Sequence, residues 1–287
     1  MYLNKIKIKF VDFWPGFNPT TDPVFGTFLQ EHYEIEYQHV NPDVIIFSVF
    51  GNTHKIYAKK NIIKIFYTPE NFLLHHYPAL DGMLGWENVD RYSHGSITSF
   101  ERIGSSNHRM PCYVRRFGFD LYDRIENNLP KTIQKKNFVY MQSACVEFRD
   151  IMVQELMEKF KIDCVGRCLN NTNINVKDKL EFIKDYNFVI SFENSSTAGY
   201  STEKLTDGFV SNTIPVYFGD PNVGKDFYDS SFVNYHSFDK KEEIYDRLND
   251  LIKDDGKKLH MLQSTKIKNK DLFNGDLFLK FIKNIIK

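Results

Sequence analysis

The segment SFENSSTAGYSTEKLTDGFVSNTIPVYFGD, residues 191–220, places a polar loop between two apolar runs. The runs on either side, NFVISF and TIPVYFG, are typical of buried strands, and a helix is expected over Thr202–Ser211 between them. Ser201 is the expected cap of this helix, with Glu203 and Lys204 in its first turn. An acidic residue stabilises a first turn, but a cation opposes the helix dipole unless an anion lies beside it. The segment predicts a strand, an anion-accepting loop, a helix and a strand.

The same alternation extends toward the N-terminus of this segment. A strand, FVYMQSA, precedes the helix EFRDIMVQELMEKF, and then come the strand IDCVG and the helix VKDKLEFIKDY. Helical spacing predicts a buried stripe on the first of these helices, made of Phe148, Ile151, Met152, Leu156 and Phe160. Alternating strands and helices predict a doubly wound α/β domain, in which ligands bind beyond the carboxyl ends of the strands.

A second sheet is expected in the first third of the chain. The segments KIKIKF and HYEIEYQHV alternate apolar with polar residues, whereas the apolar run Val44–Phe50 is typical of a strand covered on both faces. Another strand is expected over Ile62–Tyr67, stopped by Pro69. These strands predict an open and largely parallel sheet. Residues 123–135 lack apolar periodicity and are the candidate linker between the two sheets.

Composition excludes several classes of protein. Lys plus Arg and Asp plus Glu number 37 each, so no net charge attracts nucleic acid and any anion site must be local. No apolar run reaches the length of a membrane-spanning helix, and no secretory leader is evident, so a cytoplasmic protein is expected. The four cysteines lack metal-type spacing and are expected to be free buried thiols, namely Cys112, Cys145, Cys164 and Cys168.

The opening segment, read on through GDPNVGKDF and SFVNYHSF, resembles the donor-binding signature of the α1,3-fucosyltransferases, glycosyltransferase family 10. Shorter matches occur elsewhere in the chain. They comprise FGN at Phe50–Asn52, FYT-x-EN at Phe66–Asn71, RMP at Arg109–Pro111 and a strand-to-helix element that contains Arg149. The resemblance implies a GT-B α/β fold, with two Rossmann-like domains facing a central cleft.

The resemblance also implies a division of labour along the chain. Residues 1–130 would bind the acceptor, residues 131–265 would bind GDP-fucose, and residues 266–287 would form a C-terminal helix. The implied reaction is an inverting transfer of fucose from GDP-fucose to the 3-hydroxyl of N-acetylglucosamine in a β-galactosyl-N-acetylglucosamine acceptor, as in protein glycosylation or lipopolysaccharide biosynthesis. Transfer to the 4-hydroxyl, to lactose or to a peptide-linked sugar stays open.

Residues of the matching motifs receive roles by this resemblance. Arg149 and Lys204 would hold the diphosphate, and Glu203 would accept hydrogen bonds from the ribose. Tyr200 would pack near the nucleotide or fucose, while Glu193 and Asn194 would line the sugar pocket; Glu193 has the alternative of orienting Lys204 or Arg149. Arg149 has the alternative of pairing with Glu147 or Asp150 on the surface. A base contact is implied for Gly166 and Arg167, although GRCLNN has one glycine where the family turn is glycine-rich.

The catalytic base implied by the resemblance is Glu70. A glutamate has an ordinary pKa of about 4.3 and is ionised at neutral pH, so it can accept a proton. Here the family's preceding glycine is Pro69, which stiffens the turn, and a solvated carboxylate at a strand end is the structural alternative. No D-x-D motif lies at a strand end, so we expect no essential metal, and added divalent ions to stimulate activity at most modestly.

Two wider alternatives follow from the same residues. Neither Arg149 nor Lys204 distinguishes GDP-fucose from another nucleotide sugar, so a transferase of the same fold with another donor is one alternative, and a non-catalytic nucleotide-sugar or glycan-binding module is the other. The C-terminal segment DLFLKFIKNIIK has one apolar face. It predicts either a helix packing across the domains, which we favour, or peripheral contact with a membrane surface.

Overall fold

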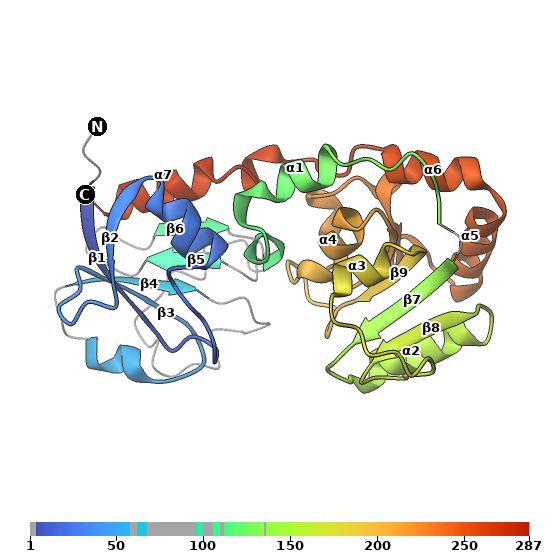
Figure 1. The fold of residues 1–287 in the computed structure, drawn as a ribbon, viewed down its shortest axis with the longest axis horizontal. Coiled ribbons are helices and arrows are strands. Elements are labelled where there is room, and N and C mark those ends of the chain that lie inside the picture. Colours follow the sequence, from blue (N-terminus) through green and yellow to red (C-terminus); the bar gives the residue numbers. More distant parts are fainter. Residues whose placement is uncertain are drawn as a thin grey trace. The chain divides into compact units, whose positions relative to one another are not determined.

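The structure is a computed structural model that describes residues 4–57, 62–67, 96–99, 106–109, 112–134 and 136–286. The chain forms two compact units (Figure 1). Unit 1 comprises residues 1–121 and 270–287, and unit 2 comprises residues 122–269. The helix α1, Leu121–Glu126, spans this boundary, so the first part of the expected linker is helical. Both units are α/β.

Unit 1 contains a six-stranded sheet with the order β2-β1-β3-β4-β5-β6. The first four of these strands are parallel, as predicted, and β5 and β6 are antiparallel additions at one edge. Ile6, Ile8 and Phe10 are buried on alternate positions of β1, while every residue of β3 is buried. The strands are β1 Asn4–Val11, β2 Tyr33–Tyr37, β3 Val44–Phe47, β4 Ile63–Tyr67, β5 Ser96–Ser99 and β6 Ser106–Arg109.

The C-terminal helix α7, Asp276–Ile285, belongs to unit 1. Its buried residues Phe278, Phe281 and Ile282 form the apolar face expected from the sequence. The Phe278 ring packs against aromatic rings of the N-terminal segment, Phe25 and Phe28. This face is therefore used inside unit 1, and the membrane-surface alternative has no support from it. No helix among the described residues is long and apolar enough to span a membrane.

Unit 2 contains a fully parallel five-stranded sheet with the order β11-β10-β9-β7-β8. The strand, helix and strand alternation predicted from the sequence is confirmed. The elements are β7 Lys136–Gln142, α2 Glu147–Met157, β8 Ile162–Gly166, α3 Lys179–Ile183, β9 Tyr186–Phe192, α4 Glu203–Val210, β10 Ile214–Phe218, β11 Val233–Asn234, α5 Lys241–Lys253 and α6 Asp255–Gln263.

Helices cover both faces of the unit 2 sheet. On one face, Phe188 and Ile190 of β9 form a core cluster with residues of α2, α5 and α6. On the other face, Val189 packs in a cluster with Ile183 of α3. Helix α4 lies on that second face, since a Cβ built on its Gly208 would come within 2.8 Å of a Val189 methyl group. Helices α2 and α4 therefore begin on opposite faces of the sheet, both at its carboxyl edge.

The predicted buried stripe of α2 is wrong in part. Phe148 and Ile151 are 37% and 49% exposed, and the inward positions are held by Arg149, Val153 and Leu156. The first turn of α2 extends past the strand ends, where apolar residues find no core to cover them. Arg149 turns inward because three oxygen acceptors lie there.

The free-thiol prediction is also wrong for two of the four cysteines. Cys145, just before α2, forms a disulfide with Cys168, in the loop after β8. Cys164 is a free buried thiol as expected, and burial raises its pKa to about 11. The side chain of Cys112 lies outside the described residues. The disulfide ties together two loops at the carboxyl edge of the sheet.

Candidate active site

The residues of the predicted anion site lie at the carboxyl edge of the unit 2 sheet. Lys204 lies in the first turn of α4, as expected, although the cap is Thr202 and not Ser201. The Thr202 hydroxyl accepts from the backbone N–H of Lys204 at 3.5 Å. Glu203 is partly exposed in the same turn. The loop of residues 194–202 thus delivers a helix N-terminus, with one cation and one carboxylate, to this edge.

Lys204 is buried and paired. Its ammonium donates to Glu193 Oε2 and to the hydroxyl of Thr202, both at 2.8 Å. Burial acts to lower the pKa of Lys204, but the carboxylates of Glu193 and Glu203 outweigh it and raise that pKa above its ordinary value. Lys204 is therefore charged at neutral pH, and its charge is balanced within the protein.

Glu193, at the end of β9, has no exposed surface. Its Oε1 accepts the backbone N–H of Thr202 at 2.7 Å, and both carboxylate oxygens accept from the Thr202 hydroxyl. Of the two roles expected for Glu193, these contacts support the orientation of Lys204. The carboxylate also serves as part of the N-terminal cap of α4. A direct contact of Glu193 with the sugar stays a prediction.

Arg149 is the second buried cation at this edge, and it has no exposed surface. Its Nη1 donates to Asn194 Oδ1 at 2.6 Å and to the Phe192 carbonyl at 3.3 Å, and its Nη2 donates to the Ala144 carbonyl. Its Nε is buried without a hydrogen-bond partner. Within the described part of the chain, no carboxylate lies within ion-pair distance of Arg149. The expected alternative of a surface pair is therefore wrong, because Glu147 is exposed and Asp150 accepts from Tyr140 instead.

The two cations reach the edge from opposite faces of the sheet. Arg149 comes from α2 and Lys204 from α4, and Asn194 follows the β9 strand between them. Burying an unpaired charge is costly, and a bound anion would offset that cost for Arg149. Arg149 offers a planar fork for two oxygens and Lys204 a compact charge, next to a helix N-terminus. This arrangement suits a diphosphate.

Of the expected base contacts, Gly166 ends β8 and Arg167 follows it at the same edge. Gly166 has a φ of +93°, and a Cβ there would lie 2.7 Å from the Gln142 carbonyl, so only glycine fits. That carbonyl accepts the backbone N–H of Arg167 at 3.0 Å. The Arg167 side chain is exposed. The turn is rigid, and its contact with a base stays a prediction.

Several supporting residues escaped the sequence analysis. The buried Asp220 carboxylate, just after β10, accepts the Gly199 N–H at 2.7 Å and the Ser201 hydroxyl at 3.2 Å, which fixes the loop that contains the buried Tyr200. Burial, and then the charge of Glu193, raise the pKa of Tyr217 well above its ordinary value, so its hydroxyl stays protonated. The segment was recognised from its sequence, but these contacts were not predicted, because they join residues about 20 positions apart.

A close approach of backbone supports the Glu193 carboxylate. A Cβ built on Gly219 would lie 2.4 Å from Glu193 Cγ and 2.7 Å from the Tyr217 hydroxyl. No side chain larger than hydrogen fits there without displacing Glu193. Packing against Glu193 and Tyr217 therefore explains why the turn of the recognised segment has glycine at this position.

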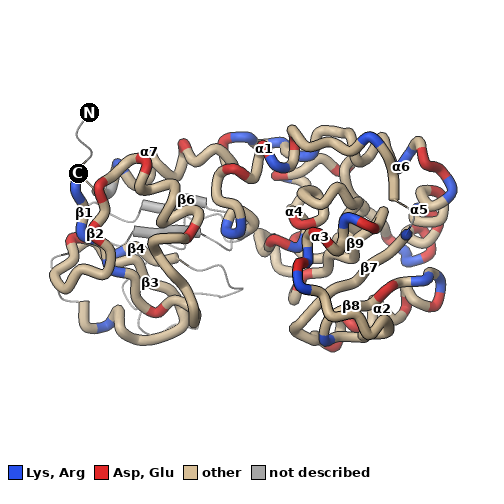
Figure 2. The backbone as a smooth tube through the Cα atoms, viewed as in Figure 1, with Lys and Arg blue, Asp and Glu red and all other residues tan. Residues whose placement is uncertain are grey.

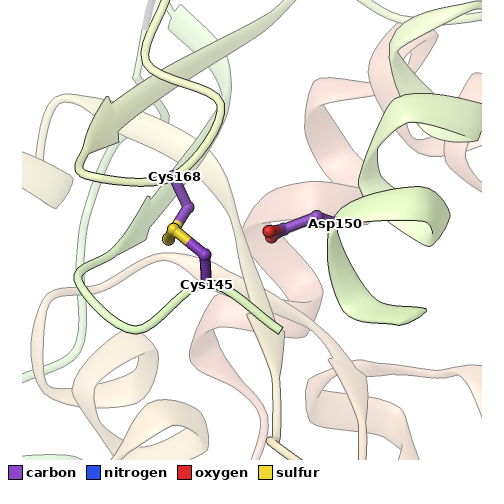
Figure 3. Close-up of side chains that lie close together, drawn as sticks. All are labelled: Cys145, Asp150 and Cys168. Carbon is purple, nitrogen blue, oxygen red and sulfur yellow. A yellow bond between two sulfur atoms is a disulfide. The ribbon is translucent and has the colours of Figure 1, made fainter. Parts of the chain in front are cut away.

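Cys145, Cys168 and Asp150 bring their ligand-type atoms within 4.8 Å of one another (Figure 3). The two sulfur atoms are bonded to each other, so the cluster offers a carboxylate and no thiolate. Such a set does not suit a transition metal, which needs deprotonated thiols here. The close-up shows the Asp150 side chain on α2 directed toward the disulfide.

The carboxyl edge of the unit 1 sheet has its own polar centre. Asp12, after β1, has a φ of +60° and accepts the backbone N–H groups of Thr53 and His54 at 2.8 and 2.9 Å. The same carboxylate contacts His54 Nδ1 at 2.6 Å. This cluster anchors the segment after the FGN motif. Glu70, the predicted base, lies outside the described residues.

Charged residues elsewhere are mixed in sign. Lys and Arg are interspersed with Asp and Glu along both units (Figure 2). This distribution agrees with the balance of 37 residues of each sign.

Comparison with known proteins identifies the family. Residues 132–265 match the profile of glycosyltransferase family 10 (fucosyltransferase) C-term, and residues 8–94 match the Alpha-(1,3)-fucosyltransferase FucT N-terminal domain. The chain belongs to glycosyltransferase family 10. The recognised segment of residues 191–220 lies inside the first match, and the Asp12 and His54 cluster lies inside the second.

Relatives and solved structures agree with this assignment of the family-10 chain. It is 27% identical over 256 residues to alpha-(1,3)-fucosyltransferase FucT of Helicobacter pylori, which covers 76% of this chain and 51% of the relative. It is 32% identical over 173 residues to GDP-fucose protein O-fucosyltransferase 3 of Xenopus tropicalis, over 53% of this chain and 33% of that protein. The chain thus spans about half or less of these relatives.

A crystal structure of an alpha1,3-fucosyltransferase with GDP-fucose matches the fold of the family-10 chain with a TM-score of 0.76. The match has 23% identity and covers 100% of this chain and 92% of the other. Its fold is GT-B, so the predicted fold class, two Rossmann-like α/β domains, is confirmed.

Proposed function

We propose that this protein is an inverting fucosyltransferase that uses GDP-fucose. The observation that supports the proposal is Arg149, a buried cation with only neutral hydrogen-bond acceptors, across the sheet edge from the paired cation Lys204. A nucleoside diphosphate would supply the missing negative charge. Membership of family 10 and the fold shared with a GDP-fucose complex favour fucose as the sugar.

The proposed reaction is a single displacement. The acceptor hydroxyl oxygen forms a bond to the anomeric carbon of fucose as the bond from that carbon to the phosphate oxygen breaks. The electron pair leaves with GDP, and the hydroxyl proton passes to the Glu70 carboxylate. Arg149, Lys204 and the N–H groups at the start of α4 stabilise the charge that builds on the diphosphate. These two basic residues supply the role that a divalent ion has in other transferases.

The proposed acceptor is the 3-hydroxyl of N-acetylglucosamine in a β-galactosyl-N-acetylglucosamine unit. Its support is the Helicobacter relative, whose name specifies the α1,3 linkage and whose match extends over 76% of this chain. The Xenopus relative is named a protein O-fucosyltransferase, which favours a protein hydroxyl as the second candidate acceptor. That match covers 53% of the chain, so it supports the donor side more than the acceptor side.

The test is release of GDP from GDP-fucose by the purified protein in EDTA, with and without N-acetyllactosamine, beside the Glu70→Gln variant. We expect release that depends on the acceptor, survives EDTA and falls on the order of 10²–10⁴-fold in the variant, the usual contribution of a general base. Saturable binding without release would reject this acceptor and call for protein substrates. Absence of GDP-fucose binding would overturn the proposal.

A further inference from the structure

An aromatic wall lies beside Arg149, one of the two cations proposed to bind the diphosphate. We define it as Phe148, Phe218 and His236. The Phe148 ring centroid lies 6.1 Å from that of Phe218, and Phe218 stacks on the His236 ring at 5.1 Å with an interplanar angle of 27°. Phe148 is 37% exposed although it directly precedes the fully buried Arg149. An apolar ring thus reaches solvent next to a buried positive charge.

Hydrogen bonds and ring contacts hold the wall in place. His236 Nε2 lies 3.0 Å from the Gly219 carbonyl, which also accepts the Ser196 hydroxyl at 2.9 Å. Because a carbonyl only accepts, His236 donates through Nε2. Phe218 also packs edge-on against Phe192 at 6.0 Å. These contacts connect the wall to the loop of residues 194–202 and limit its rearrangement when a ligand binds.

The wall lies on the α2 face of the unit 2 sheet. Phe218 and Phe192 belong to the core cluster on the α2 face, whereas Lys204 and Glu203 start α4 on the other face. A diphosphate held between Arg149 and Lys204, with its ribose at Glu203 as the resemblance implies, would leave its sugar-bearing phosphate on the α2 side, where the wall lies.

Fucose differs from L-galactose only at carbon 6, which is a methyl group in fucose and a hydroxymethyl group in L-galactose. A methyl group gains free energy by packing against phenyl rings. A hydroxyl group in the same place loses water without a hydrogen-bond partner from either ring. We propose that Phe148 and Phe218 form the subsite that receives carbon 6 of the donor sugar and so select a 6-deoxy sugar. This inference rests on the proposed function.

The test compares two donors that differ by one hydroxyl group, GDP-fucose and GDP-L-galactose. We expect the wild-type protein to prefer GDP-fucose in kcat/KM by on the order of 10- to 100-fold, the usual discrimination of an apolar pocket. Phe148→Ala should lower this ratio about tenfold, and Phe148→Asn should lower it further because its amide can bond the extra hydroxyl. Ile151→Ala, which removes the exposed apolar residue one turn along α2, should leave the ratio within twofold of wild type.

Each result decides the point. An unchanged donor ratio in both Phe148 variants, with transfer from GDP-fucose retained, overturns the inference and leaves the proposed function standing. A changed acceptor KM with an unchanged donor ratio also overturns it, because the wall then meets the acceptor. A wild-type protein that binds GDP-fucose no better than GDP-L-galactose and transfers neither sugar overturns both.

Discussion

The starts of α2 and α4 each bury one cation at the same sheet edge, but they treat its charge differently. Lys204 pairs with Glu193 at 2.8 Å, while Arg149 meets the amide oxygen of Asn194 and two backbone carbonyls. The charge of Lys204 is already balanced by a carboxylate of the protein, so this pair contributes to the folded state before any ligand binds. Arg149 has no such carboxylate, and its burial is a cost to the folded protein that an anionic ligand would offset. The two helix ends therefore differ in how much of their positive charge is balanced within the protein.

The largest expected effect tests the paired side. Glu193→Ala leaves Lys204 buried without its carboxylate and removes the acceptor of the Thr202 N–H, so the free energy of unfolding should fall by about 3–5 kcal/mol. Urea denaturation measures it. Glu155→Ala, which breaks the exposed pair with Lys241, is the control and should leave the free energy of unfolding nearly unchanged. If the two variants lost the same free energy of unfolding, the buried pair of Glu193 and Lys204 would contribute no more to stability than an exposed pair.

Arg149→Ala tests the unpaired side. Transfer from GDP-fucose should fall on the order of 10²–10³-fold, because the diphosphate loses its planar donor in the transition state. Arg149→Lys should recover only part of the rate, since an ammonium lacks the two-oxygen fork. Arg247→Ala, which removes an exposed positive charge on α5, controls for net charge.

The free energy of unfolding of Arg149→Ala gives a second test of how the two cations differ. Without ligand, Arg149→Ala should lose less unfolding free energy than Glu193→Ala, because it removes a buried charge and does not strand one. A larger loss in Arg149→Ala would mean that this cation is structural and would weaken its assignment to the donor.

The disulfide tests what positions Arg149. The bond between Cys145 and Cys168 closes a separation of 23 residues, and its loss should cost about 3 kcal/mol in the free energy of unfolding. Cys145→Ser should match wild type treated with a reductant, and the affinity for GDP should fall because the Ala144 carbonyl adjoins Cys145. Titration of four thiols in the untreated, unfolded protein would show that the bond does not form.

Gly219→Ala has the smallest expected effect. The added methyl group would overlap Glu193 Cγ and should cost about 1–3 kcal/mol, as overpacking does. Gly224→Ala is the matched control, since its Cβ would meet only Asp229 at 3.4 Å, and it should stay within about 0.5 kcal/mol of wild type. Thermal unfolding of the two variants side by side measures the difference.

The sequence predicts the architecture well because strand and helix periods are local. The parallel sheets, the alternation in unit 2 and the first-turn position of Lys204 all follow from patterns within about 15 residues. The cap was assigned one residue early, to Ser201, because adjacent hydroxyl residues are equivalent in sequence. Thr202 is selected by its bonds to Glu193, nine positions away.

The inward side of α2 was not predictable in the same way. Its apolar residues Phe148 and Ile151 have the spacing of a core stripe, but that stripe overhangs the end of the sheet. Arg149 faces inward because of acceptors at positions 144, 192 and 194, which only the fold brings together. The partner of Cys145 is likewise set by the meeting of two loops and not by a spacing. The site therefore depends on long-range contacts more than the fold does.

The return of α7 to unit 1 determines the order in which the two halves can be completed during synthesis. Unit 2 is continuous, so it can fold as soon as Asn269 has left the ribosome. Unit 1 must wait for Phe278 and Ile282, which complete its core, although its sheet was made first. Unit 2 is thus expected to mature before unit 1, although most of unit 1 precedes it in the chain. A stop codon shortly after residue 269 would damage the earlier half and spare the later one.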